Sequence, residues 1–486
     1  MTTKKRESTA LVWFRRDLRT HDNPALSAAC SGHQSVIAVY FYTPLQSDRH
    51  DIGANHRWFT LAHVAALRDD LEQLGIPLLV REEPLFRDCP ATLLDIAQRF
   101  DAEDVYLNSE LEINEHQRDA DAASHLEQAG VRLHTSHDQT IFIPGTITTQ
   151  GGHFYKVFTP FKKAFITKAQ GLEIDPLSKP RKISAPLDID PRDLGEISNI
   201  TPTCKKRWAI GETHARRALK AFVEHGIFEY KKQRDFPAVD ATSRLSPYLA
   251  VGAISLRECL YEALKANSYS FEGGSEGIAC WISELIWREF YKHLMIGFPW
   301  VCKHAAFNAE YSGVPWREAP ADFQAWCEGR TGYPLVDAAM KQLVAEGWMH
   351  NRLRMVVAMF LTKHLLIDWR LGEKFFAQHL VDFDLAANNG GWQWSASTGA
   401  DAAPYFRIFS PVRQSERFDP DGEFIKHYLP ELAALGSKSI HSPSPLEAAA
   451  ADYPQPITEH RFAVDRAKQT FRTAKEQQPN ITEHAL

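Results

Sequence analysis

The sequence predicts an α/β domain built on a doubly wound parallel sheet, joined by a long linker to a large all-α domain. Up to about residue 140, apolar runs rich in β-branched and aromatic residues alternate with helix-like segments. The next stretch is rich in Pro, Lys, Ser and Asp, and from about residue 208 the hydrophobic pattern is helical. We therefore expect an α/β domain at residues 1–140, a linker at 141–206, an all-α domain at 207–460 and a tail at 461–486.

The elements of the α/β domain follow from these runs. Strands are predicted at residues 10–14, 36–42, 77–80, 104–107 and 131–134, with helices at 55–74, 91–100 and 115–128. Right-handed crossovers would place these strands side by side in a parallel sheet. The turn after the first strand, Phe14-Arg15-Arg16-Asp17-Leu18-Arg19, lacks the glycines of a GxGxxG turn, which argues against an NAD-dependent oxidoreductase.

Composition limits the class of protein. The chain is 44% hydrophobic and 24% charged, with a net charge of −6, so contact with a nucleic acid would need a local basic patch. The seven cysteines are scattered without a CxxC pair, which indicates a reducing compartment and no zinc site. The start of the chain lacks an apolar signal core, and no run is long enough to span a membrane. We expect a soluble, cytoplasmic monomer.

Helices of the second domain are predicted at 212–225, 277–295, 334–346 and 347–365. Between the first two of these helices, Thr242, Ser243 and Arg244 precede Pro247, which suits a first helical turn. Such a helix start offers N–H groups and positive charge to a phosphate, although a capped helix without a ligand has the same pattern.

Aromatic and charged residues share one face of the helix at 277–295. Trp281 precedes Glu284 by three residues, and Glu284 and Arg288 are four apart, which favours an ion pair along the helix. This face suits either a solvated helix edge or a wall for a flat ligand.

The helix at 347–365 places polar residues where a core face would be apolar. The spacing i, i+3, i+4, i+7 puts four residues on one face of this helix, namely Asn351, Arg354, Met355 and Ala358. Buried polar groups need partners, and a ligand could supply them. Within the segment 382–394, the first ten residues combine two acids, two amides and two glycines, which predicts a shaped loop able to bind ribose or ring N–H groups rather than a surface turn.

Taken together, seven segments resemble the photolyase/cryptochrome family, and most of all the bacterial class I cyclobutane pyrimidine dimer photolyases. The matching residues extend from about 10 to 460 and read VWFRRDLR at 12–19, YKVFTPF at 155–161, QRDFP at 233–237, TSRLS at 242–246, ELIWREFY at 284–291, WMHNRLRM at 348–355 and DLAANNGGWQW at 384–394. The resemblance implies an α/β antenna domain and a helical domain that binds FAD, with the reduced cofactor as the active form.

The resemblance also implies which residues bind FAD. Its phosphates would contact Tyr230, Thr242, Ser243, Arg244, Leu245 and Ser246. Its ribityl chain and ring would lie among Trp281, Glu284, Arg288, Asn351, Arg354, Asp382, Asp384 and Asn388. Arg354 and Asp382 would form an ion pair, and Asn388 near the flavin N5 would favour the reduced anion.

By the same resemblance, the reaction is light-driven DNA repair. Reduced FAD would lend an electron to a dimer flipped out of UV-damaged DNA, and the electron would return after the cyclobutane bonds break. The catalytic residues would be Glu284, Asn351, Met355 and Asn388. DNA would contact Arg234, Trp287, Asn351, Arg352, Met355, Trp394 and Gln414, since aromatic rings beside cations suit unstacked bases.

Nine of the twelve tryptophans lie between residues 281 and 394, and this clustering indicates a role beyond general core packing. Trp392, Trp369 and Trp316 match the family's electron relay from the surface to the flavin. An antenna pigment, 5,10-methenyltetrahydrofolate, would bind at His50, Asn114, Glu115, Cys302 and Lys303. Asn114 and Glu115 also suit a plain helix start, and a deazaflavin, another pigment or an empty site remain alternatives.

Two other members of the family are weighed against dimer repair. A (6-4) photolyase needs a histidine at the position of Asn351, and His350 is one place away. A blue-light receptor would carry a longer C-terminal extension and would change Asn388.

Overall fold

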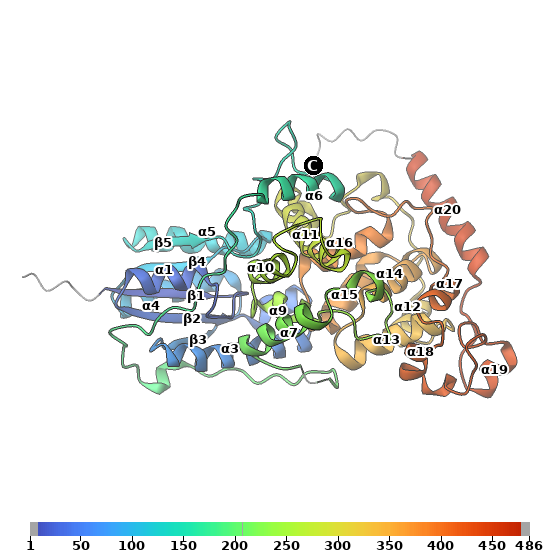
Figure 1. Cartoon of the computed structure of the whole chain (residues 1–486), viewed down its shortest axis with the longest axis horizontal. Coiled ribbons are helices and arrows are strands. Elements are labelled where there is room, and N and C mark those ends of the chain that lie inside the picture. Colours follow the sequence, from blue (N-terminus) through green and yellow to red (C-terminus); the bar gives the residue numbers. More distant parts are fainter. Residues whose placement is uncertain (1–7, 207, 478–486) are drawn as a thin grey trace, which may run out of the picture.

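The computed structural model describes residues 8–206 and 208–477, with a sheet-containing part and a helical part side by side (Figure 1). The sheet has five parallel strands in the order β3-β2-β1-β4-β5, which is the expected doubly wound arrangement. The strands are β1 (Thr9–Phe14), β2 (Ser35–Tyr42), β3 (Leu78–Glu82), β4 (Ala102–Asn108) and β5 (Arg132–Ser136). All five predicted strands are confirmed.

The sheet is buried on both faces because successive side chains of a strand point to opposite sides. On β1, Ala10, Val12 and Phe14 belong to one hydrophobic core, while Leu11 and Trp13 belong to another. The helices of this domain are α1 (Pro24–Gly32), α2 (Pro44–Arg49), α3 (Ala54–Gln73), α4 (Cys89–Arg99) and α5 (Ile113–Gln128). The sequence does not predict α1, which is rich in small residues, or the short α2.

The linker contributes to the core as well as connecting the domains. We expected little regular structure there, but α6 (Phe158–Ala169) lies within it, followed by the short η2 (Pro191–Leu194). Phe161 of α6 is buried 5.2 Å from the ring of Phe290. Its apolar residues therefore fix α6 against the helical domain.

The described chain from residue 208 onward is helical and adds no strand to the sheet. Its helices are α7 (Glu212–His225), α8 (Tyr230–Gln233), α9 (Ser246–Val251), α10 (Leu256–Ala266), α11 (Glu276–Gly297), α12 (Pro320–Cys327), α13 (Pro334–Glu346), α14 (Asn351–Met359), α15 (Trp369–His379), α16 (Leu385–Ala396), α17 (Pro411–Phe418), α18 (Glu423–Tyr428), α19 (Pro445–Ala450) and α20 (His460–Gln477). Shorter turns are η3 (Pro299–Lys303), η4 (Ala309–Tyr311), η5 (Phe360–His364) and η6 (Pro430–Leu432). Within the described ranges, no helix has both the length and the apolarity to cross a lipid bilayer.

Two expectations about local structure are wrong. Residues 382–394 do not form a loop, because Asp384 caps a helix there by accepting a hydrogen bond from the Ala387 N–H at 3.1 Å. The helix predicted at 347–365 begins only at Asn351, where His350 is the cap, and its last turn widens into the π-helical η5.

The tail expected after residue 460 is largely the helix α20. Phe471 of α20 is fully buried and packs 5.8 Å from Trp316, so this helix belongs to the folded helical domain. The predicted domain boundary at residue 207 and the last part of the tail, residues 478–486, lie outside the described residues.

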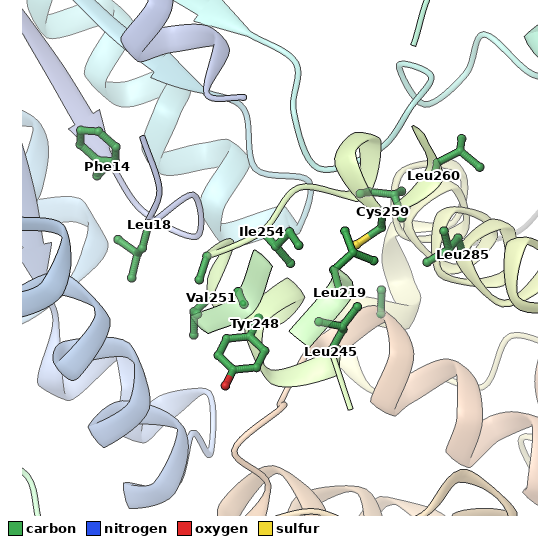
Figure 2. Packing of buried hydrophobic residues seen from close by; sticks show 14 of the residues in the cluster. Phe14, Leu18, Leu219, Leu245, Tyr248, Val251, Ile254, Cys259, Leu260 and Leu285 are labelled. Atoms are coloured by element: carbon green, nitrogen blue, oxygen red, sulfur yellow. The ribbon is translucent and has the colours of Figure 1, made fainter. Parts of the chain in front are cut away.

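One hydrophobic core crosses the boundary between the two domains. Phe14 at the end of β1 and Leu18 in the turn after it share this core with Tyr248 and Val251 of α9 (Figure 2). The backbones meet so closely that a Cβ on Gly252 would lie 2.1 Å from the Arg16 carbonyl oxygen, and φ is +71° there. Glycine is therefore required at this contact.

Candidate active site

Four helices that carry predicted cofactor residues meet in the helical domain. They are α8, α11, α14 and α16, together with the residues that directly follow α8 and directly precede α16. Three ion pairs connect them, namely Arg234–Glu284, Arg288–Asp384 and Arg354–Asp382.

Arg354 and Asp382 form the ion pair that the resemblance implies. Nη2 of Arg354 lies 2.8 and 3.0 Å from the two carboxylate oxygens of Asp382. Nε of Arg354 also donates to the Met349 carbonyl oxygen at 2.8 Å, which fixes the plane of the guanidinium. Because Asp382 is buried and Arg354 is half-buried, the pair offers an oriented positive and negative group to a ligand.

Asp384 is the buried centre of a larger charge cluster. Its Oδ2 lies 3.1 Å from Nη2 of Arg288 and 3.0 Å from Nζ of Lys292. Burial raises the pKa of a carboxyl, but the charges of Lys292 and Arg288 overcome it and hold the pKa of Asp384 well below its usual range. Asp384 is therefore ionised at any physiological pH.

Glu284 does not pair with Arg288 as its helical spacing suggested. Its Oε1 accepts a hydrogen bond from Nη1 of Arg234, while Arg288 is drawn to the buried Asp384. Nη1 of Arg234 also lies 3.3 Å from the Cys280 sulfur, and its guanidinium lies 5.2 Å from the ring centre of Tyr230. A partly exposed carboxylate is thus held beside the residues of α8.

The amide of Asn388 has a defined orientation. Asn388 is buried in the first turn of α16, and its Nδ2 donates to the Glu373 carbonyl oxygen at 3.0 Å. Asn351 is exposed at the first position of α14, and Met355 is half-buried one turn later. These last two side chains can therefore reach a molecule that approaches from outside.

The predicted phosphate segment lies beside a network of charges. Arg244 has φ +49°, and its guanidinium contacts Asp240 at 3.1 Å and Glu346 at 3.4 Å. Trp348 lies under this guanidinium, and its Nε1 donates to Ser246 Oγ at 3.2 Å. Leu245 is buried, whereas Thr242 and Ser243 keep half-exposed hydroxyls. The expected hydroxyl cap of α9 is absent, because no side chain caps this helix.

The predicted DNA-contacting residues lie near this site, and two of them hold unused polar atoms. Arg352 pairs with Asp235 at 2.9 Å, but its buried Nε has no hydrogen-bond partner in the described structure. The same holds for Oε1 of Gln414. Trp287, expected to stack on a base, stacks face to face on Phe158 with ring centres 3.7 Å apart, so one of its two faces is already covered.

The predicted relay tryptophans belong to a hydrophobic core that lies within the helical domain and is separate from the core shared with the sheet. Trp392 and Trp369 are buried within it, and the half-buried Trp316 packs against it. Trp326, which the sequence did not single out, lies 6.0 Å from Trp392 in the same core.

A cavity of about 280 Å³ lies at the carboxyl ends of β1, β2 and β4 and reaches the start of α16. His50, Asn114, Glu115 and Cys302 line it, as the antenna prediction requires, whereas the exposed Lys303 does not. Asn114 and His50 hydrogen-bond across it, with Nδ2 and Nε2 2.9 Å apart.

The floor of this cavity is charged. Arg16, Glu112 and Glu115 all line it. Burial and the nearby charge of Glu112 raise the pKa of Glu115 to about 7. Burial acts in the same direction on Glu112, but Arg16 and Lys292 lower its pKa to about 2. Near neutral pH, Glu115 can therefore either donate or accept a hydrogen bond.

The comparisons with known proteins agree with this geometry. Residues 10–181 match the family described as DNA photolyase, and residues 281–473 match the FAD binding domain of DNA photolyase. A deoxyribodipyrimidine photo-lyase of Salmonella typhimurium is 45% identical, and the match covers 94% of this chain and 96% of that protein. One from Escherichia coli is 43% identical, covering 94% and 97%.

The chain belongs to the DNA photolyase family.

Solved photolyase-family structures have the same fold. A bacterial class III photolyase from Agrobacterium tumefaciens superimposes with a TM-score of 0.88 at 34% identity, covering 98% of this chain and 99% of that one. A cryptochrome from Synechocystis gives a TM-score of 0.82 at 28% identity, covering 96% and 100%. The fold is thus shared by repair enzymes and cryptochromes, so the site residues must distinguish the two.

The residues of this photolyase site fit FAD. The ion pair of Arg354 and Asp382 offers both a donor and an acceptor to a polar ring edge, and the oriented amide of Asn388 adds a third polar contact. Hydroxyls at Thr242 and Ser243 can hydrogen-bond phosphate oxygens. The FAD-binding domain match covers three of these five residues, since it begins at Trp281.

Sequence reasoning about the photolyase site missed an ion-pair network at the domain boundary. Arg16 and Glu112 pair within the α/β domain, and Glu112 also pairs with Lys292 of the helical domain. No motif spacing in the sequence indicates these pairings. Glu112 and Lys292 are 180 residues apart, so only the folded chain brings them together.

Proposed function

We propose that this protein splits cyclobutane pyrimidine dimers in DNA in a light-driven reaction that uses reduced FAD. The observation that carries the proposal is the meeting of α8, α11, α14 and α16, where three ion pairs hold the predicted cofactor and substrate residues together. FAD, when bound and reduced, supplies the electron that opens the cyclobutane ring and then takes it back.

The residues of this chain perform the remaining tasks. Glu284, held by Arg234, hydrogen-bonds the dimer and stabilises the charge that it gains. Asn351 and Met355 contact the flipped bases from α14, and Arg352 and Gln414 help to orient them. Trp394 and the open face of Trp287 stack against the bases and exclude water.

The surroundings of His350 favour cyclobutane dimers over (6-4) photoproducts. His350 is buried, and its Nδ1 accepts a hydrogen bond from the Arg352 N–H at 3.2 Å. Burial lowers its pKa to about 4, so it is neutral at physiological pH. A neutral imidazole used as a helix cap is unsuited to donate a proton to the substrate, and Asn351 stands at the position that would have to be histidine.

A repair assay tests the proposal. An oligothymidine with cyclobutane dimers is incubated with the reduced holoprotein under blue light, and recovery of thymine absorbance is followed. We expect recovery in the light and none in the dark, and no conversion of a (6-4) oligonucleotide. Equal recovery in the dark, or repair of the (6-4) product alone, would contradict the proposal.

We also propose that the cavity of about 280 Å³ holds 5,10-methenyltetrahydrofolate as an antenna. Glu115 is suited to hydrogen-bond the amino edge of a pterin, and His50 and Asn114 line the same space. The absorption spectrum of the purified protein should combine flavin bands with a strong near-ultraviolet band. A spectrum with a deazaflavin band instead would identify another pigment.

A further inference from the structure

A buried lysine connects the two domains. Lys292 of α11 has a side chain only 1% exposed, and its Nζ lies 3.0 Å from Oε1 of Glu112 and 3.0 Å from Oδ2 of Asp384. Glu112 belongs to the α/β domain, immediately before α5, whereas Asp384 caps α16 in the helical domain. One ammonium group thus bridges a carboxylate from each domain.

Each of these carboxylates has a second cationic partner. Nη1 of Arg16 lies 3.1 Å from Glu112 Oε1, and Nη2 of Arg288 lies 3.1 Å from Asp384 Oδ2. The five side chains therefore form a continuous series of ion pairs, in the order Arg16, Glu112, Lys292, Asp384 and Arg288. The three inner charges are buried and persist only while each has its partners, so a change at one end of the series alters the energy of the other.

The two ends of the series lie in different cofactor sites. Arg16 and Glu112 line the antenna cavity, while Arg288 and Asp384 belong to the proposed FAD site. We propose that pigment binding and FAD binding strengthen each other, and that Lys292 is the positioning residue that carries this coupling. The inference rests on the proposed function, because it takes both sites to be cofactor sites.

The sign of the coupling follows from solvent exclusion. A polar cavity is filled with water until a ligand enters it. A bound pigment removes water from beside Arg16 and Glu112, and ion pairs are stronger where the dielectric constant is lower. A firmer contact from Glu112 to Lys292 orders Asp384, and with it the first turn of α16, where Asn388 lies. FAD then loses less conformational entropy on binding, so its affinity rises.

Titration of the full chain freed of cofactors tests the coupling in the dark and without DNA. FAD affinity is measured by flavin fluorescence, with and without saturating 5,10-methenyltetrahydrofolate. We expect the folate to tighten FAD binding by about fivefold or more, and FAD to tighten folate binding by the same factor, since equilibrium coupling is reciprocal. Equal FAD affinities under the two conditions overturn the proposal.

Variants assign the coupling to Lys292. Lys292→Met removes the ammonium group and should reduce the coupling factor to one, whereas Lys292→Arg keeps the charge and should retain coupling. Lys363→Met is the matched control, because Lys363 is equally buried and contacts the opposite end of α16, with Nζ 3.0 Å from the Ala396 carbonyl oxygen. It should weaken FAD binding equally with and without folate, so that the factor stays unchanged.

Each remaining outcome has a defined meaning. If Lys292→Met does not fold, Glu112→Gln serves as the second variant, because it weakens the same contact while keeping a polar side chain. Full coupling between FAD and folate binding in whichever variant folds overturns the role of Lys292. If the wild-type chain binds neither FAD nor folate, the proposed function itself fails. If it binds both independently, only the coupling fails.

Discussion

Glu284 is held in place by a residue outside its own helix. Its carboxylate accepts a hydrogen bond from Arg234 of the segment after α8, and it remains partly exposed. A carboxylate fixed in this way can hydrogen-bond a substrate without reorganising, which is the condition for strong electrostatic stabilisation.

Glu284→Ala should lower the quantum yield of dimer repair about tenfold, the effect of losing one hydrogen bond to a charged group. FAD content should stay unchanged, because the contacts of Arg354 with Asp382 do not involve Glu284. Yield is measured on reduced protein under blue light, and FAD by its absorbance. Glu276→Ala, an exposed acid at the start of the same helix, is the control. Complete loss of flavin would show that Glu284 binds the cofactor instead.

Glu115 gives the unliganded protein a pH-dependent stability. Its pKa is raised from 4.5 to about 7, so the folded chain favours the protonated carboxyl. This contribution to stability is fully present below pH 4.5 and is lost as the pH rises through about 7. Glu115→Gln should therefore raise the melting temperature at pH 8 and leave it nearly unchanged at pH 4.5.

Thermal unfolding of both proteins across this pH range provides the measurement. Glu127→Gln, an exposed acid on the same helix α5, should melt as the wild type does at both pH values. Parallel pH profiles for wild type and Glu115→Gln would contradict the raised pKa.

At the residue scale, the motifs gave the pairing of Arg354 with Asp382 correctly but the partner of Glu284 wrongly. Spacing on one helix suggested that Glu284 pairs with Arg288, yet Arg288 contacts Asp384, which is nearly a hundred residues away in the chain. The reason is physical: a buried carboxylate gains more from a cation than a partly exposed one does. Long-range competition of this kind leaves no local signal.

At the scale of elements, strands and long amphipathic helices were predictable, whereas α16 was not. Its Asp, Asn and Gly residues favour turns in isolation. In the folded chain they serve packing instead: a Cβ on Gly390 would lie 2.3 Å from the ring of Tyr291 on α11. The glycine allows the two helices to approach, and tertiary contact overrides the local preference.

A pair of adjacent glycines on α16 tests this explanation. Gly390→Ala should destabilise the protein by about 1–3 kcal/mol, because its methyl group collides with Tyr291. Gly391→Ala meets no atom within 4 Å and should stabilise the helix by up to about 1 kcal/mol. Denaturant unfolding measures both. Equal effects of the two substitutions would mean that helix propensity alone governs this segment.

At the scale of the whole molecule, the three predicted relay tryptophans lie in or against one hydrophobic core of the helical domain. Trp392 lies on α16, Trp369 begins α15, and Trp316 is half-buried beside α20. Each of the three comes from a different part of the chain, so only the complete helical domain brings them into one core.

Trp392→Phe should slow photoreduction of oxidised FAD by a large factor, because phenylalanine is much harder to oxidise than tryptophan. Repair by protein that is already reduced should be unaffected. The rate is followed as the loss of oxidised-flavin absorbance under blue light. Trp326→Phe is the control, since Trp326 is equally buried and only 6.0 Å from Trp392 but outside the predicted relay. If Trp326→Phe slows photoreduction as much, the relay is assigned wrongly.

The core shared by Phe14, Leu18, Tyr248 and Val251 makes the two halves of the molecule inseparable (Figure 2). Cutting the chain in the linker would leave apolar surface on both fragments, and neither would keep the partner that covers it. A chimera that carries the α/β domain of a distant relative would have to repack this shared core before it could unfold as a single unit. Changing the ligand that the cavity accepts would therefore require substitutions among its lining residues, because exchange of the whole domain would disrupt this core.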